Sequence, residues 1–81
     1  MSYNGYTNWE TWNVMLWASN EEDIYNEVCR FLEFYPRPTP GMCQGFFEDI
    51  FPCGTPDMER ASEMCPVNWN SIAQHLRAWN D

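Results

Sequence analysis

The segment 8–17, which reads Asn-Trp-Glu-Thr-Trp-Asn-Val-Met-Leu-Trp, carries three tryptophans and constrains the fold more than any other part of the chain. Thr7 and Glu10 fit a capping box, in which the threonine hydroxyl accepts from a backbone N–H and the glutamate reaches back to the cap. Glu10 also lies near the positive end of the helix dipole. The segment therefore predicts a helix over about residues 8–18, capped by Thr7.

This predicted helix is apolar on two sides. Trp9, Trp12 and Leu16 share one face, at helical spacings of three and seven residues. Val14 and Trp17 lie on the other side. Because a helix that is apolar on two sides is usually buried on both, we expect a central core helix organised around Trp9, Trp12 and Leu16. The alternative is that Val14 and Trp17 form an exposed patch for a partner.

A second helix is predicted to follow directly. Ser19 starts another capping-box match, with Asn20 as an alternative cap, and acidic residues fill the turn that follows. The helix should end before Pro36, because the residue before a proline avoids the helical region. Its apolar stripe consists of Ile24, Val28, Phe31, Leu32 and Tyr35.

The proline-rich segment 36–41 is expected to act as a stiff connector to a third helix. Thr39 can cap that helix, with Pro40 at the first helical position, where the missing N–H costs nothing. The helix is held by packing rather than by helix propensity, because glycines interrupt it. Its apolar residues are Met42, Phe46, Phe47, Ile50 and Phe51.

Two more helices are predicted near the C-terminus. The sequence Thr-Pro-Asp at 55–57 has a cap, a proline and an acid in the order that starts a helix, over about residues 56–64. Asn68 or Asn70 caps the last helix. The buried face of the last helix is formed by Trp69, Ile72, Ala73, Leu76 and Trp79.

No window alternates apolar and polar residues for long, so no strand is expected. The chain has 81 residues, of which 44% are hydrophobic and 17% aromatic, and this suffices for one domain with a modest core. We therefore predict an all-α fold, a small single-domain bundle of four to five short helices. The domain spans residues 1–81, with a polar arm at 1–6 and the connector at 36–41.

Twelve acidic residues face four arginines, and the absence of lysine leaves a formal net charge of −8. This charge argues against direct binding of nucleic acid or of an anionic membrane. It suits a partner protein with a basic surface, although solubility alone also explains it. The N-terminus has no basic start or apolar stretch, and no run is long enough to cross a membrane, so we expect a cytoplasmic protein.

The sequence offers little chemistry for catalysis or metal binding. Cys29, Cys43, Cys53 and Cys65 are widely spaced and form no C-x-x-C pair. Zinc held by these cysteines, or by three of them with His75, is an alternative that lacks the usual close-spaced pairs. We predict reduced, free thiols and no metal or cofactor. A lone histidine, with no nucleophile motif or phosphate-binding loop, indicates that the protein is not an enzyme.

Two parts of the sequence resemble small uncharacterised proteins of bacteriophages and other mobile elements. Residues 6–14, Tyr-Thr-Asn-Trp-Glu-Thr-Trp-Asn-Val, are similar to the opening of those proteins, together with Leu-Trp at 16–17, Asn-Glu-Glu at 20–22 and Tyr25. Residues 67–69, Val-Asn-Trp, with Ile-Ala at 72–73 and His-Leu at 75–76, are similar to their ending. The resemblance implies a phage or mobile-element origin and a role inside the bacterial host, and it carries over no catalytic residues.

These observations predict an acidic interaction protein that binds and modulates, by inhibition, a host protein with a basic nucleic-acid-binding surface. Its carboxylates would occupy a groove meant for phosphates and so mimic DNA. The alternative is a structural or accessory phage protein that forms homo-oligomers, a homodimer for instance, through an exposed aromatic patch. The predicted partner-binding residues are Glu22, Asp23, Glu33, Glu48, Asp49, Glu59, Glu63 and the apolar anchor Trp17.

Overall fold

Asn8, Thr39 and Asn68 each begin a helix, because a side-chain oxygen of each accepts a hydrogen bond from the backbone N–H three residues later. The fourth helix has Glu21 as its N-cap residue and makes no side-chain cap hydrogen bond. The computed structural model describes residues 5–79. Its regular elements are α1 (Trp9–Asn20), α2 (Glu22–Phe34), α3 (Pro40–Ile50), the 3-10 turn η1 (Ala61–Met64) and α4 (Trp69–Arg77).

The buried face of α1 is the one opposite to the predicted face. Trp9, Trp12 and Leu16 are half-buried, so the expectation that they form the centre of the core is wrong. The core-facing residues of α1 are spaced three, four and seven positions apart. Most of them are short, and Met15 is the one long side chain, so neighbouring helices can approach closely. The core face consists of Thr11, Val14, Met15 and Ala18, each at most 3% exposed. An exposed patch at Val14 is therefore also excluded.

A single residue, Glu21, separates α1 from α2. Its extended backbone turns the chain, and its N–H donates to the carbonyl of Trp17 at 3.1 Å. The predicted start at Ser19 or Asn20 is wrong, because both residues still belong to α1. The hydroxyl of Ser19 donates back to the carbonyl of Met15 at 2.7 Å instead of capping α2. In α2, Val28 and Leu32 are buried, Ile24 and Phe31 half-buried, and Tyr35 beyond its end exposed.

Residues 35–39 link α2 to α3. Pro38 is buried, and its carbonyl accepts a hydrogen bond from Nε of Arg77 at 3.2 Å, which ties the link to the end of α4. The predicted start of α3 is confirmed, since Thr39 is its N-cap and Pro40 its first residue.

The helix predicted over residues 56–64 does not form. Thr55 is 1% exposed, and the side chain of Asp57 is bonded to α1, so long-range contacts hold this segment in an irregular conformation. The carboxylate of Glu63 accepts from the N–H of Arg60 at 3.1 Å, and only the short turn η1 follows. The predicted helix had few apolar residues of its own, which is why tertiary contacts could override its starting signal.

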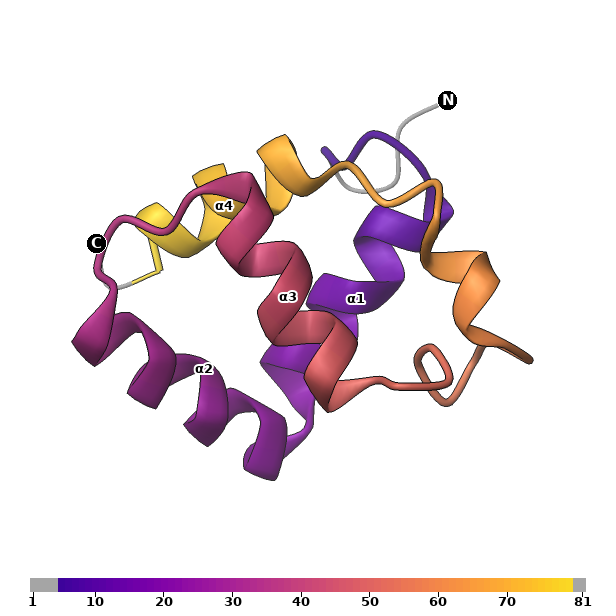
Figure 1. Ribbon diagram of the computed structural model, residues 1–81, viewed down its shortest axis with the longest axis horizontal. Helices are drawn as coiled ribbons and strands as arrows, with labels where there is room; N and C mark the ends of the chain where they lie inside the picture. Colours follow the sequence, from indigo (N-terminus) through magenta and orange to yellow (C-terminus); the bar gives the residue numbers. More distant parts are fainter. Residues whose placement is uncertain (1–4, 80–81) are drawn as a thin grey trace.

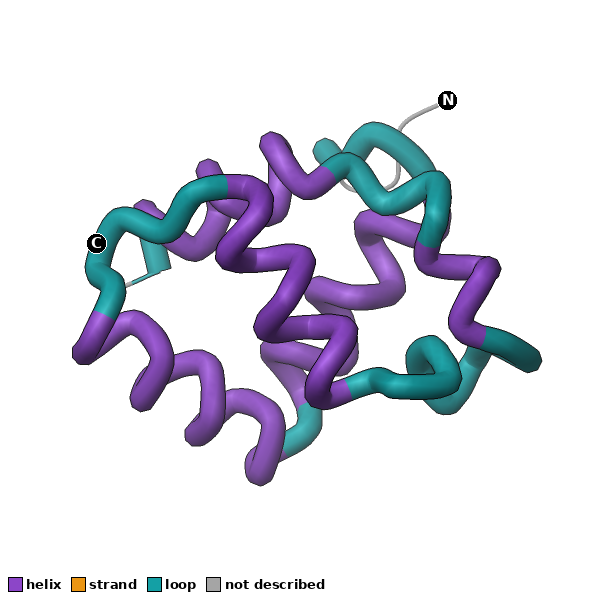
Figure 2. The backbone as a smooth tube through the Cα atoms, viewed as in Figure 1, coloured by secondary structure: helices purple, strands orange, loops and turns teal. Residues whose placement is uncertain are grey.

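The helices form two packed pairs. α2 packs on α1, α3 packs on α4, and α1 also contacts α4, within a molecule of 30 × 26 × 23 Å (Figure 1). The segment that connects α3 to α4 consists of loops on either side of η1, and it passes beside α1 (Figure 2). The core contains the fully buried side chains of Val14, Val28, Phe47, Ile72 and Leu76. Within residues 5–79 there is no β-strand beyond isolated bridges, so the protein is a small all-α domain, as predicted.

Candidate functional site

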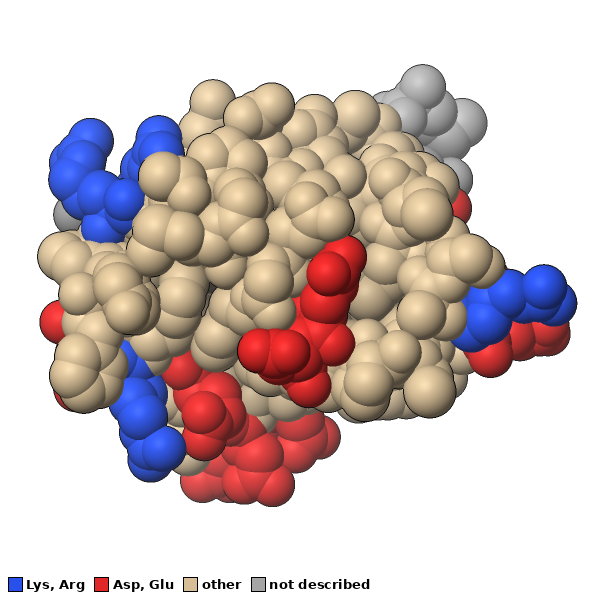
Figure 3. Space-filling model, viewed as in Figure 1, with Lys and Arg blue, Asp and Glu red and all other residues tan. Residues whose placement is uncertain are grey.

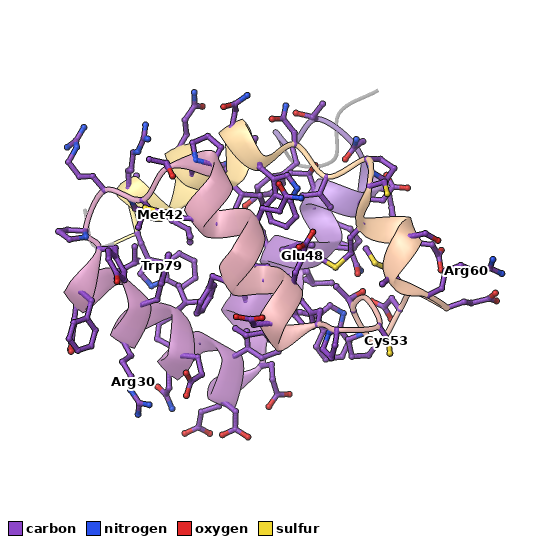
Figure 4. All side chains as sticks on the ribbon, in the orientation of Figure 1. Arg30, Met42, Glu48, Cys53, Arg60 and Trp79 are labelled. Atoms are coloured by element: carbon purple, nitrogen blue, oxygen red, sulfur yellow. The ribbon has the colours of Figure 1, made fainter. Side chains whose placement is uncertain are left out.

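Acidic side chains from α2 and α3 gather on one face of the molecule. Glu22 and Asp23 occupy the first turn of α2, where the helix dipole favours negative charge. Glu48 and Asp49 are exposed on α3. Figure 3 shows carboxylates over the beginning of α2 and over the later half of α3, where Figure 4 labels Glu48. We refer to Glu22, Asp23, Glu48 and Asp49 as the acidic face.

The other predicted carboxylates lie elsewhere. Glu33 is in the last turn of α2, about 16 Å along the helix axis from Glu22 at about 1.5 Å per residue. Glu59 and Glu63 flank Arg60, which Figure 4 labels at the opposite end of the molecule from α2. The carboxylate of Glu63 also accepts hydrogen bonds from the backbone at Glu59 and Arg60. These three acids therefore do not extend the acidic face.

The acidic face has no arginine paired with it. Among residues 5–79, the one ion pair joins Arg30 to Glu27 at 3.5 Å, and both side chains are more than half exposed. Glu48 instead accepts a hydrogen bond from the neutral amide of Gln44 at 3.0 Å. Because the net charge is −8 and exposed pairs contribute little, the carboxylates project a field that protein cations do not neutralise.

Trp17 does not stand free of the fold as an anchor. Its ring is half-buried against the core, and its Nε1 donates to Oδ2 of Asp57 at 2.9 Å. The same carboxylate oxygen accepts from Nδ2 of Asn13 at 2.8 Å, and the hydroxyl of Thr55 donates to Oδ1 of Asn13. We call these four residues the α1–loop clamp. The hydrogen bonds from Asn13 and then from Trp17 lower the pKa of Asp57, because they stabilise its charged form.

A second polar cluster joins the beginnings of α1 and α4. Oδ1 of Asn8 accepts from the backbone N–H and the hydroxyl of Thr11, at 2.9 and 2.7 Å. The hydroxyl of Thr11 in turn accepts from the backbone N–H of Asn68 at 2.8 Å, and Nδ2 of Asn68 donates to the hydroxyl of Thr7 at 2.9 Å. The cap of α1 is therefore Asn8 and not Thr7, whose hydroxyl serves α4 instead.

These two clusters explain why the opening and closing segments of the chain carry their polar residues. The asparagines and threonines of segment 7–13 bind residues 55–57 and 66–68, more than forty positions away. Sequence reasoning missed Asn13, Thr55 and Asp57. An available signal was the asparagine at position 13 inside an otherwise apolar helix, since a buried amide needs partners.

Among residues 5–79, the large exposed hydrophobic side chains come from α2 and its end: Tyr25, Phe34 and Tyr35, at 43%, 74% and 52% exposure. The exposed aromatic surface therefore lies on α2 and not at Trp17. Tyr25 contacts the ring of Trp79 at a centroid distance of 5.4 Å, so it is partly supported by α4's end. Phe34 is the most exposed of the three and makes no ring contact among the described residues.

The cysteines are dispersed over the fold. Cys43 is buried in α3, Cys29 is half-buried, and Cys53 and Cys65 are exposed, all as free thiols. Burial raises the pKa of Cys43 to about 11, although the charge of Arg77 acts in the opposite direction. Within residues 5–79, no three or more His, Cys, Asp or Glu side chains come together as they would for a metal ion.

His75 packs against the ring of Tyr6, with 4.4 Å between ring centroids. None of the helices within residues 5–79 has the length and apolar character that crossing a membrane requires.

These features define a small all-α protein with an acidic face and two internal polar clusters. The chain belongs to a family described as a family of unknown function (DUF7249), whose sequence model matches residues 1–76. No curated protein and no solved structure matches the chain. The matched region includes both polar clusters and the acidic face.

Proposed function

We propose that this protein is an acidic interaction module that binds a partner protein with a basic surface. The observation that carries the proposal is the acidic face, on which Glu22, Asp23, Glu48 and Asp49 lie together without a paired arginine. A surface of this kind attracts cationic surfaces over a distance and raises the rate of association.

We further propose that the partner is a nucleic-acid-binding protein of a bacterial host, which the module inhibits by DNA mimicry in the host cytoplasm. The support is the sign of the charge. The protein has a net charge of −8, so its carboxylates present to a basic groove the same negative charge as the phosphates of DNA. The resemblance of segments 6–17 and 67–76 to proteins of phages and mobile elements supports the host setting. Direct binding to DNA or to a membrane is not expected.

The test starts with capture of partners from a bacterial lysate on the tagged chain, followed by affinity measurements across a salt series. Two double variants reverse the acidic face: Glu22→Lys with Asp23→Lys, and Glu48→Lys with Asp49→Lys. Each should weaken binding roughly tenfold, or about 1.4 kcal/mol, and should reduce the salt dependence. A short DNA duplex should compete with the wild type for the partner.

Glu59→Lys is the matched control, because it also reverses an exposed carboxylate but lies near Arg60, away from the acidic face. It should leave the affinity within about twofold of the wild type. Affinity that responds neither to salt nor to either double variant would refute the acidic-face proposal. Binding of the wild type to DNA itself at physiological salt would refute the mimicry.

A second candidate function is self-association through the aromatic surface of α2. The observation that favours it is Phe34, whose side chain is 74% exposed. Sedimentation of the wild type should then show an oligomer that Phe34→Ser converts to a monomer. A monomer at high concentration and high salt, where charge repulsion is screened, would exclude this function.

A further inference from the structure

An open apolar groove lies between α2 and α3. It has a volume of about 520 Å³ and is lined by Phe31, Tyr35, Met42, Phe46 and Asp49. Four of the five lining side chains are aromatic or thioether groups, and the fifth is a carboxylate. The lining residues from α3 run from Met42, near the beginning of the helix and labelled in Figure 4, to Asp49 near its end, so the groove extends along this helix.

The groove follows from the way the helices pair. α2 packs on α1 while α3 packs on α4, so α2 and α3 meet through the stacked rings of Phe31 and Phe46, whose centroids are 4.3 Å apart. Phe46 in turn contacts the fully buried ring of Phe47 edge-on at 5.0 Å. The floor of the groove is therefore anchored in the core, and a ligand would meet a preformed surface.

Charge is distributed unequally along the groove. Asp49 lines it, and Glu48 of the acidic face is the next residue along α3. Tyr35 marks the other end, and Arg37 follows two residues later in the chain. An occupant with a cation beside an apolar side chain therefore fits with its cation toward Asp49. A second copy of this chain fits poorly, because each copy carries −8 and would bring its own carboxylates to this end.

We propose that this groove is the anchor site for a basic amphipathic segment of the partner protein. An aliphatic or aromatic side chain of that segment lies on Phe31, Met42 and Phe46, and a neighbouring lysine or arginine pairs with Asp49. Methionine and aromatic linings are typical of grooves that receive such segments. The inference rests on the proposed function. It assigns the apolar contribution to the binding energy to this groove.

The test uses a synthetic helical peptide with leucines at spacings of three and four residues and lysines elsewhere, titrated into protein with ¹³C-labelled methionine methyl groups. The Met42 methyl signal should shift. Met15, Met58 and Met64 are buried in the core, so their signals should stay in place and serve as internal references. A peptide with each leucine replaced by serine keeps the charge, and it should bind about tenfold more weakly without shifting Met42.

Two pairs of neighbouring residues provide matched variants for the same peptide. Asp49→Asn should weaken binding about threefold more than Glu48→Gln, because both remove one charge from α3 and only Asp49 lines the groove. Tyr35→Ala should weaken binding about fivefold, whereas Phe34→Ala, which removes a more exposed ring outside the lining, should leave it unchanged. Unfolding transitions of the four variants show that each remains folded.

The outcomes separate the anchor site from the proposed function. A Met42 signal that stays in place at saturating peptide, or equal effects within each pair of variants, would overturn the groove proposal. If salt-sensitive binding persists in that case, the acidic face alone recognises the partner. If neither peptide binds, the groove proposal fails, and the acidic-face proposal is decided separately by the salt series and the double variants with the captured partner. Sedimentation that shows dimers blocked by the peptide would assign the groove to a second copy and overturn the proposal.

Discussion

Nδ2 of Asn13 in α1 donates to Oδ2 of Asp57 across 2.8 Å, although the two residues are 44 positions apart in the chain. Asn13 is 1% exposed, and its Oδ1 accepts from the equally buried hydroxyl of Thr55. One amide therefore satisfies two groups of a loop that has no regular structure of its own between α3 and η1. The loop depends on this contact for its conformation.

Asn13→Ala should destabilise the protein by about 1–3 kcal/mol, because it leaves the Thr55 hydroxyl buried without its acceptor and removes a donor from Asp57. Urea unfolding followed by circular dichroism measures the change. Asn26→Ala is the control, since Asn26 is exposed on α2 and its replacement should change stability by less than about 0.5 kcal/mol. Equal changes in stability for the two variants would show that the α1–loop clamp contributes nothing to the free energy of unfolding.

The lowered pKa of Asp57 predicts how stability depends on acid. A carboxylate whose pKa is lower in the folded state stabilises that state above its unfolded pKa of about 3.9, and the contribution is lost as the pH falls through the folded pKa. Asp57→Asn should therefore flatten the loss of stability below about pH 4 relative to the wild type. Urea midpoints measured from pH 2 to 6 provide the test, with Asp49→Asn as the control. Parallel curves for wild type and Asp57→Asn would contradict the clamp.

The contrast between helix starts and packing faces shows what local sequence can predict. The caps at Thr39 and Asn68 depend on side chains three residues from the N–H they satisfy. Thr39 was the predicted cap, and Asn68 was one of two candidates, with Asn70 as the other. The cap of α1 was misplaced by one residue, because Thr7 and Asn8 are both capable caps. Which of them caps α1 depends on Asn68, which lies 61 positions from Thr7 and donates to its hydroxyl.

The buried face of α1 could not be read from residue size. Tryptophans suggested one face, yet the core takes the face with Thr11 and Ala18, because short side chains allow α2 and α4 to approach. Only part of the acidic face could be predicted from the sequence, because tertiary packing determines which helices share a face. Glu22 and Asp23 are neighbours in sequence and share the first turn of α2. That carboxylates over the beginning of α2 and over the later half of α3 lie on one face, as Figure 3 shows, is a property of the tertiary fold.

The cysteines should differ in reactivity according to their burial. At pH 8, iodoacetamide should modify the exposed Cys53 and Cys65 rapidly and should leave Cys43 intact. Burial excludes the reagent from Cys43 and raises the thiol pKa to about 11, so little thiolate is present. Mass spectrometry of timed samples resolves the sites, and modification in urea provides the fully accessible reference. Modification of Cys43 at the rate of Cys53 would contradict its place in the core.

Two glycines should respond to alanine in opposite directions. Gly54 has a φ of +85°, and an added Cβ would lie 3.0 Å from the carbonyl oxygen of Arg60, so Gly54→Ala should destabilise by about 1–3 kcal/mol. Gly45 lies inside α3 with nothing within 4 Å of an added Cβ, and Gly45→Ala should stabilise by about 0.5–1 kcal/mol. Thermal unfolding measures both. A gain in stability from Gly54→Ala would show that the turn before η1 has another conformation.

The two ends of α2 carry the same charge in opposite dipole environments. Glu22 lies in the first turn, where a negative charge stabilises the helix, and Glu33 lies in the last turn, which has no basic residue. Glu22→Gln should therefore lower stability and Glu33→Gln should raise it, each by about 0.3–1 kcal/mol at low salt. Both variants change the net charge by the same amount, so general repulsion cancels in the comparison. The difference should shrink at high salt, and effects of the same sign at low salt would mean that net charge, and not position along α2, determines the outcome.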